Sequence, residues 1–203
     1  MTAKELESKR EVILKTAREM LAKYGFAKLT LDDIAGALGM KKSSLYYYYE
    51  NKEALLEDVM RHEQVLYTAA TEEALAAPGT TFERLVRYEK AKFAYIQNAI
   101  KLHEMSTSVL LEIKNKMITH IRAMYENEIV RVKKVLDEGV KAHEIKQCNT
   151  RRVAELMLIM SEALRHREFY YASFHLGQPI DLSKASDEMV FALELMFNGL
   201  SSE

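Results

Sequence analysis

Apolar residues near the start of the chain recur at the three- and four-residue spacing of an α-helix. From Ile13 to Tyr24 they fall on one helical face, and Gly25 follows at a place where a left-handed residue ends a helix. The pattern therefore predicts a first helix over about residues 6–24.

Two short helical segments come next, separated by a tight turn. Thr30 is suited to cap a helix, and Asp33 completes a short-armed capping box for a helix over 31–38. Gly39 ends this helix, and the helical pattern resumes over 43–49. Two short helices joined by a glycine-containing turn are typical of a helix-turn-helix.

Longer helices account for most of the remaining chain. Asn51 is suited to cap the first of them, which ends at the Ala-Ala-Pro-Gly stretch over 76–79. Thr80 and Glu83 form a capping box for a helix that continues through Ile96. Further helices are predicted from about 116 to 139–143, from Asn149 or Thr150 to about 175, and from a cap at Ser183 onward, with a short irregular helix or a break over 101–114. With about nine helices and no alternating strand pattern, we expect an all-α fold.

The charge balance limits how the chain can bind nucleic acid. Its 203 residues include 29 basic and 30 acidic side chains, which leave a net charge of −1. Any binding to nucleic acid must therefore come from a local patch rather than from overall charge. The pattern predicts no membrane span and no secretory signal, and the one cysteine, Cys148, has no partner for an internal disulfide. We expect a cytoplasmic protein.

Four consecutive tyrosines occupy the third predicted helix, within SSLYYYYENK. On a helix, Leu45 and Tyr49 share one face. Tyr46 flanks that face, whereas Tyr47 and Tyr48 point away from it, so one apolar stripe does not bury all four rings. One interpretation is a pair of core tyrosines with solvated neighbours. The other is that the outward rings contact a specific partner.

The order of these elements resembles the N-terminal domain of the tetracycline-repressor family of bacterial transcription regulators. The segment that carries the resemblance is VILKTAREMLAKYGFAKLTLDDIAGALGMKKSSLYYYYENKEALL, about 45 residues. The rest of the chain is compatible with the divergent C-terminal helical domain of that family. The resemblance thus implies a helix-turn-helix DNA-binding domain over 1–50 and a ligand-binding and dimerisation domain over 51–203.

The resemblance also implies roles for individual residues. Residues 43–49 match the recognition helix, which enters the major groove of DNA. Positions that contact backbone phosphates are matched by Thr30, Tyr46, Tyr48 and Lys52. Positions that reach base edges are matched by Lys42, Ser43 and Ser44, and a lysine there donates to guanine O6 and N7. Tyr47 matches a groove-facing position that packs on thymine methyl groups.

Two positions depart from the family pattern. Lys41 stands where a serine usually caps the recognition helix, so another group must cap it. Asp32 stands where some members carry a basic residue, and its carboxylate would repel a phosphate. Residues 1–60 hold ten basic and ten acidic side chains, so the basic footprint comes from Lys41, Lys42 and Lys52.

Eleven methionines raise the question of a ligand pocket. Thioether side chains repack around varied ligands, although ordinary core packing explains them equally well. The resemblance favours a pocket for a small apolar effector within the helices from about 82 to 175. Its predicted lining consists of Phe93, Ile96, Met105, Leu110, Met117, Ile121, Tyr125 and Met160.

The last two predicted helices hold more apolar and aromatic residues than one buried stripe needs, which usually marks an interface. The resemblance implies that these helices form a two-fold, four-helix homodimer interface. Its predicted residues are Leu164, Tyr171, Phe174, Phe191 and Leu195.

We therefore expect a ligand-responsive DNA-binding transcriptional regulator, a repressor that binds a palindromic double-stranded operator as a homodimer. The alternative is a helical ligand-binding or adaptor protein of the same architecture that does not read DNA. The six histidines show no metal-site spacing, and no catalytic motif is present in the sequence. We expect neither a cofactor, nor a metal, nor an enzyme.

Overall fold

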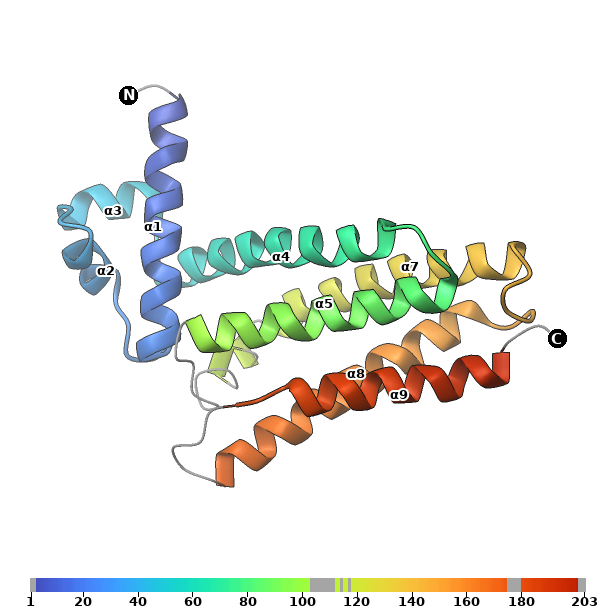
Figure 1. Ribbon diagram of the computed structural model, residues 1–203. Coiled ribbons are helices and arrows are strands. Elements are labelled where there is room, and N and C mark those ends of the chain that lie inside the picture. Colours follow the sequence, from blue (N-terminus) through green and yellow to red (C-terminus); the bar gives the residue numbers. More distant parts are fainter. Residues whose placement is uncertain (1–2, 103–111, 114, 117, 175–179, 201–203) are drawn as a thin grey trace. The chain divides into compact units, whose positions relative to one another are not determined.

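The chain forms eight α-helices in the computed structural model, which describes residues 3–102, 112–113, 115–116, 118–174 and 180–200. The helices are α1 (Ala3–Tyr24), α2 (Leu31–Ala37), α3 (Lys42–Tyr48), α4 (Lys52–Ala76), α5 (Thr81–Leu102), α7 (Ile118–Lys141), α8 (Thr150–Phe174) and α9 (Ser183–Leu200) (Figure 1). No β-strand occurs within these ranges, so the all-α prediction is confirmed. The short helix or break predicted over 101–114 lies mostly outside the described residues.

The chain divides into two compact units. One consists of Met1–Leu66 and Ile100–Ile118, and the other of Tyr67–Ala99 and Thr119–Glu203. Helix α4 runs through the boundary between Leu66 and Tyr67. The functional division into residues 1–50 and 51–203 stays a prediction.

Helix starts follow the predicted caps. In the first capping box, the Thr30 hydroxyl accepts from the backbone N–H of Asp33 at 3.1 Å, and the Asp33 carboxylate accepts from the N–H of Thr30 at 2.9 Å. Thr80 and Glu83 make the same reciprocal pair, at 3.3 and 2.9 Å. The Asn51 side chain accepts from a backbone amide of α4 at 2.8 Å. These local hydrogen bonds satisfy N–H groups that have no partner inside the helix.

The predicted cap at Ser183 is wrong. Ser183 is the first residue of α9, and its backbone N–H donates to the Asp181 carboxylate at 3.0 Å. The Asp181 side chain can accept from an amide two residues later, as a serine side chain in a turn also can. Its negative charge suits the N-terminus of the helix.

The first unit is built around the packing of α1, α2 and α3 (Figure 1). Its core consists of apolar side chains that are almost fully enclosed, among them Ile13, Ala17, Ile34, Leu45 and Leu55. Gly25 and Gly39 adopt positive φ angles of 78° and 62°, which let the chain turn sharply after α1 and α2. The two turns make it possible for α1 and the two short helices α2 and α3 to share one core.

The second unit packs α5, α7, α8 and α9 around a core that includes Leu85, Val132, Leu136, Met157 and Leu193. Helices α8 and α9 lie side by side (Figure 1). Helix α7 approaches the start of α5 closely at Gly139. A Cβ on Gly139 would lie 2.2 Å from the hydroxyl oxygen of Thr81, which is itself buried. Only glycine permits this distance between the two elements.

A charged cluster is buried in the core of the second unit. Lys92 is 1% exposed, and its Nζ lies 3.3 Å from Glu128 and 3.5 Å from Glu89. Tyr67 donates a hydrogen bond to Glu128, and Ser161 donates one to Glu89 at 2.8 Å. Because burial disfavours a charged carboxylate, it raises the pKa of Glu89. For Glu128, burial acts in the same direction, but Lys92 and Tyr67 outweigh it and lower the pKa. Lys92 and Glu128 therefore form the ion pair of this core.

Replacing Gly139 with alanine should lower the free energy of unfolding by about 1 to 3 kcal/mol, because the new methyl group overlaps Thr81. Urea denaturation followed by circular dichroism measures the change. Gly199→Ala is the matched control, since a Cβ there meets no atom within 4 Å and helix propensity should leave stability unchanged or raise it by up to about 1 kcal/mol. Equal stability of the two variants would contradict the close approach.

Candidate nucleic-acid interface

Helix α3 presents its tyrosines in two directions. Leu45 is 0% exposed and Tyr49 is 5% exposed, as the helical spacing predicts. Tyr47 is 77% exposed and Tyr46 45% exposed, so both phenol groups are accessible from solvent. Tyr48 is only half-buried rather than fully outward, because its ring packs edge-on against Tyr47 with centroids 5.6 Å apart and planes at 89°. The exposed surface of α3 is thus a rigid aromatic face.

Tyr49 anchors the end of α3 to two other helices. Its hydroxyl donates to Asp58 of α4 at 2.6 Å. Arg10 of α1 donates to both oxygens of the same carboxylate, each at 2.8 Å. A bidentate guanidinium and a phenol on one carboxylate restrict the orientation of all three elements. The sequence pattern identified Tyr49 as a core residue, but it gave no signal for Arg10 or Asp58.

The electrostatics of this anchor follow from its contacts. Burial alone raises the pKa of Asp58, but the hydrogen bonds from Arg10 and Tyr49 outweigh it and hold the pKa below its usual range. Burial raises the pKa of Tyr49 well above its ordinary value, so the phenol stays protonated and remains a donor. The carboxylate is therefore charged, and the phenol neutral, throughout the physiological range.

The start of α3 carries an intramolecular ion pair. Lys41, the N-cap residue, makes no side-chain hydrogen bond to the helix. The Lys42 Nζ lies 2.5 Å from the Asp32 carboxylate of α2 and 5.8 Å from the Tyr46 ring centroid. Asp32 raises the pKa of Lys42 through this hydrogen bond. Both side chains are exposed to solvent, so the pair can exchange with an external partner.

Lys52 also has a partner within the protein. Its Nζ donates to the backbone carbonyl of Phe26 at 2.7 Å and lies 4.2 Å from the centroid of the Phe26 ring. Because Phe26 follows the turn after α1, this contact fastens that turn to the start of α4. The predicted DNA contacts Thr30 and Ser43 are exposed, and Ser44 is half-buried.

The residues predicted to line an effector pocket are only partly described. Phe93 is buried, whereas Ile96, Ile121, Tyr125 and Met160 are half-buried; Met105, Leu110 and Met117 lie outside the described residues. Burial, together with the charges of nearby glutamates, raises the pKa of Tyr125 to about 12. Two cavities found in the described part of the chain, of about 510 and 250 Å³, have other linings. The sequence pattern did not indicate either of them.

The predicted dimer residues are largely exposed. Tyr171 and Phe174 on α8, and Phe191 and Leu195 on α9, are solvent-exposed, and Leu164 is half-buried. Three further exposed side chains, Leu156, Ile159 and Tyr170, share the same face of α8 as Phe174. We call Leu156, Ile159, Tyr170 and Phe174 of α8, together with Phe191 and Leu195 of α9, the α8–α9 apolar face.

Other candidate chemistry is weak. Cys148 is half-buried, and burial together with the Asp137 charge raises the pKa of its thiol, which disfavours the reactive thiolate. Among the described side chains, no group of three histidine, cysteine or acidic residues is arranged to hold a metal ion. None of the described helices is long and apolar enough to cross a membrane.

Comparison with known proteins agrees with the geometry of α1 to α4. Residues 13–59 match the family model described as bacterial regulatory proteins, tetR family. The segment from α1 to the first part of α4 therefore resembles the N-terminal domain of that family. The match supports a DNA-binding regulator of transcription, and the alternative of an adaptor that does not read DNA is not favoured.

Two relatives extend the match beyond that domain. An uncharacterised HTH-type transcriptional regulator of Bacillus subtilis, YhgD, is 24% identical over 160 residues, which cover 77% of this chain and 82% of the relative. The HTH-type transcriptional repressor KstR2 of Mycolicibacterium smegmatis is 28% identical over 120 residues. That match covers 54% of this chain and 58% of the repressor, so it spans little more than half of either protein.

A solved structure shares the fold over nearly the whole chain. The crystal structure of a transcriptional regulator from Cytophaga hutchinsonii superposes with a TM-score of 0.78 at 23% sequence identity. The match covers 96% of this chain and 99% of that one. The C-terminal helices therefore share the fold of that regulator.

Replacing Asp58 with asparagine should destabilise the first unit by about 1 to 3 kcal/mol at neutral pH, because Arg10 and Tyr49 lose their charged acceptor. A depressed carboxyl pKa stabilises the fold above the unfolded value of about 3.9 and stops doing so as pH falls through the folded value. The difference between wild type and variant should thus be constant near neutrality and shrink below about pH 4.

Urea denaturation across this pH range measures the free energy of unfolding. Hydrogen exchange of the α3 amides over the same range measures how firmly α3 is held. Glu57→Gln, which removes an exposed carboxylate one residue away on α4, is the control and should leave both measurements unchanged. A pH-independent difference between wild type and the Asp58 variant would show that the carboxylate charge does not hold α3.

Proposed function

We propose that the chain is a repressor that binds a palindromic double-stranded DNA operator as a homodimer and is released by a small apolar effector. The observation that carries the proposal is the α3 surface: exposed Tyr46 and Tyr47 above the enclosed Leu45 and Tyr49. Seven helical residues are about 10 Å long and fit a major groove about 12 Å wide. A helix fixed on one face and aromatic on the other suits contact with DNA.

In this proposal the residues of α3 divide between base and phosphate contacts. Lys42, Ser43 and Ser44 reach base edges at the start of the helix, and Tyr47 packs on thymine methyl groups. Phosphate oxygens accept hydrogen bonds from Thr30, Tyr46, Tyr48 and Lys52, with Lys41 adding charge nearby. Neutral phenol donors position the protein on DNA without adding much non-specific affinity.

Asp32 influences how Lys42 contacts DNA. The ion pair with Asp32 holds Lys42 across the face of α2 before DNA binds, and the pair must open when Lys42 donates to a guanine. Because Asp32 also repels phosphate, DNA that offers no guanine at that position gains little from opening the pair. The pair therefore favours specific over random sequence.

Homodimer formation would use the α8–α9 apolar face. On α8 it extends from Leu156 to Phe174, or about 27 Å along the helix. Exposed aromatic side chains at this density are enriched in interfaces between subunits. Two-fold symmetry would place two copies of α3 on half-sites about 34 Å apart.

Effector control requires coupling between the units. Helix α4 is continuous across the unit boundary, so a change around its part from Tyr67 to Ala76 can be transmitted to its start at Lys52. A coupling free energy of about 1 to 3 kcal/mol would change operator affinity roughly 5- to 150-fold. Like other partners of chromosomal DNA, the protein would act in the cytoplasm, and the reaction involves no covalent step.

A gel-shift experiment with the DNA upstream of the protein's own gene tests the proposal. We expect a saturable complex with two subunits per site that a scrambled duplex of equal length does not displace. Footprinting should reveal two half-sites separated by about one helical turn. Equal affinity for the upstream and scrambled duplexes would refute sequence-specific binding.

Asp32→Asn should raise affinity for random duplex several-fold and make the salt dependence steeper by about one counterion, because Lys42 becomes free to contact a phosphate. Lys42→Ala should instead cost about 1 to 3 kcal/mol on the operator and relax the preference at one base pair. Fluorescence anisotropy at several salt concentrations measures both effects.

Glu57→Gln again serves as the control, since it makes the same charge change as Asp32→Asn on an exposed site of α4. If Asp32→Asn and Glu57→Gln increase random-duplex affinity equally, net charge alone explains the effect and the ion pair has no specific role.

Phe191→Glu should weaken homodimer formation at least about tenfold, because it puts a charge on the α8–α9 apolar face. Light scattering of the purified protein gives the mass, and operator affinity should fall with it. Val130→Glu, a charge on an exposed apolar site of α7, should leave the mass unchanged. The same mass for both variants as for wild type would place the dimer contact elsewhere.

A further inference from the structure

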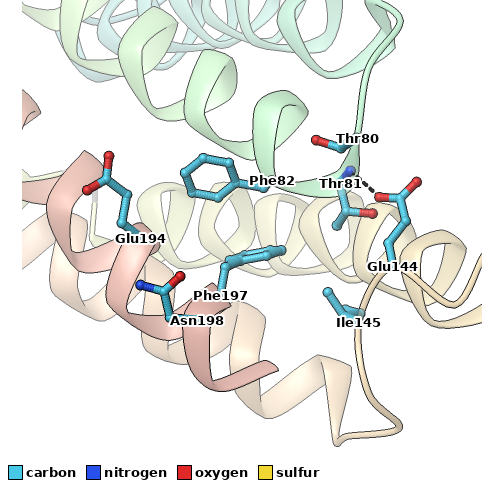
Figure 2. A pocket seen from close by; sticks show the side chains of 8 residues that line it. All are labelled: Thr80, Thr81, Phe82, Glu144, Ile145, Glu194, Phe197 and Asn198. Atoms are coloured by element: carbon cyan, nitrogen blue, oxygen red, sulfur yellow. Dashed lines mark hydrogen bonds between the residues drawn. The ribbon is translucent and has the colours of Figure 1, made fainter. Parts of the chain in front are cut away.

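The larger of the two cavities named above lies in the second unit and has a volume of about 510 Å³. The start of α5, the segment after α7 and the end of α9 surround it (Figure 2). Its lining consists of Thr80, Thr81, Phe82, Glu144, Ile145, Glu194, Phe197 and Asn198. The volume falls in the range of small-molecule sites, about 300 to 1,000 Å³.

The side chains of this cavity are suited to positive charge. Two of the eight lining residues, Glu144 and Glu194, carry carboxylates, and none of the eight is basic. Phe82 and Phe197 face each other with ring centroids 5.4 Å apart and planes at 58° (Figure 2). Aromatic faces attract cations, and they favour weakly hydrated organic ammonium groups over small metal ions.

The two carboxylates differ in their surroundings. Glu144 accepts a hydrogen bond from the backbone N–H of Thr81 at 2.5 Å, which fixes it against the start of α5. Glu194, in contrast, makes no hydrogen bond or ion pair with any side chain in the described part of the chain, and it lies near Phe82 at the other end of the cavity (Figure 2). Glu194 is thus the carboxylate available to a ligand.

We propose that this cavity binds a small organic cation with an alkylated ammonium group. The ammonium methyl groups pack against the side of the Phe82–Phe197 ring pair that borders the cavity, and Glu194 balances the charge. Thr80, at the opposite end of the cavity from Glu194 (Figure 2), offers a hydrogen bond to a hydroxyl group at the other end of such a ligand. The site shares no residue with the apolar effector pocket predicted from the sequence, and it does not depend on DNA binding.

A pair of isosteric probes tests the proposal on the full-length protein. (3-Hydroxypropyl)trimethylammonium carries the charge, and 4,4-dimethylpentan-1-ol has the same shape with carbon in place of nitrogen. Isothermal titration calorimetry at physiological salt should show saturable binding of the cation at or below about 10 mM, and binding of the alcohol at least about tenfold weaker.

Variants locate the site. Glu194→Gln should weaken cation binding about 5- to 10-fold and leave the alcohol unaffected, because only the charge is removed. Phe82→Leu should lower the affinity for the cation several-fold, because the aromatic ring is lost although an apolar side chain still fills the position. Asp187→Asn removes an exposed carboxylate of α9 outside the cavity and should change neither affinity. Circular dichroism confirms the fold of each variant.

Three outcomes would overturn the proposal. They are equal affinity for the cation and the alcohol, no saturable binding of the cation, and equal effects of Glu194→Gln and Asp187→Asn. The second outcome includes the case in which a partner subunit covers the cavity, since Glu194 is next to Leu195 of the α8–α9 apolar face. None of these outcomes alters the gel-shift result, so the two proposals fail separately.

Discussion

The hydrogen bond from Tyr49 to Asp58, with Arg10 on the same carboxylate, is the constraint on which the candidate interface depends. A helix of seven residues does not persist in water on its own hydrogen bonds. Helix α3 keeps its shape because Leu45 is enclosed at its centre and Tyr49 is fixed at its end. The outward tyrosines owe their orientation to these two inward residues. Recognition by α3 is therefore a property of the three-helix packing rather than of the helix alone.

Local features of the fold were predictable from the sequence because their causes are local. The capping boxes at Thr30 and Thr80 join residues three apart, and the burial of Leu45 and Tyr49 follows from the helical repeat. The family resemblance supplied the order of the first helices for the same reason, since it rests on one continuous segment. Ser183 is not the cap because α9 already begins at this residue, and its own amide donates to Asp181 two residues earlier.

The contacts that shape the sites were not predictable, because their partners are distant in sequence. Arg10 and Asp58 are 48 residues apart, and in the sequence neither can be told from a charged residue on a solvated helix face. Asp32 was recognised as a departure from the family pattern, but its ion pair with Lys42 depends on how α2 and α3 pack. The cation cavity gathers residues from 80 to 198, none of which has an unusual spacing. Periodicity identifies which residues are inside, and tertiary packing decides which of them meet.

The enclosed Lys92 restricts how the second unit can change over generations. Its ammonium group lies 3.3 Å from Glu128, out of reach of water, so the charges of Lys92 and Glu128 are each tolerated only in the presence of the other. Loss of one partner leaves an uncompensated charge in the core, at a cost of about 3 to 5 kcal/mol, whereas a joint exchange for apolar residues of similar volume is often neutral. Descendants of this chain should therefore keep the Lys92–Glu128 pair intact or replace both residues together, and the intermediates between those two states are the ones that selection removes.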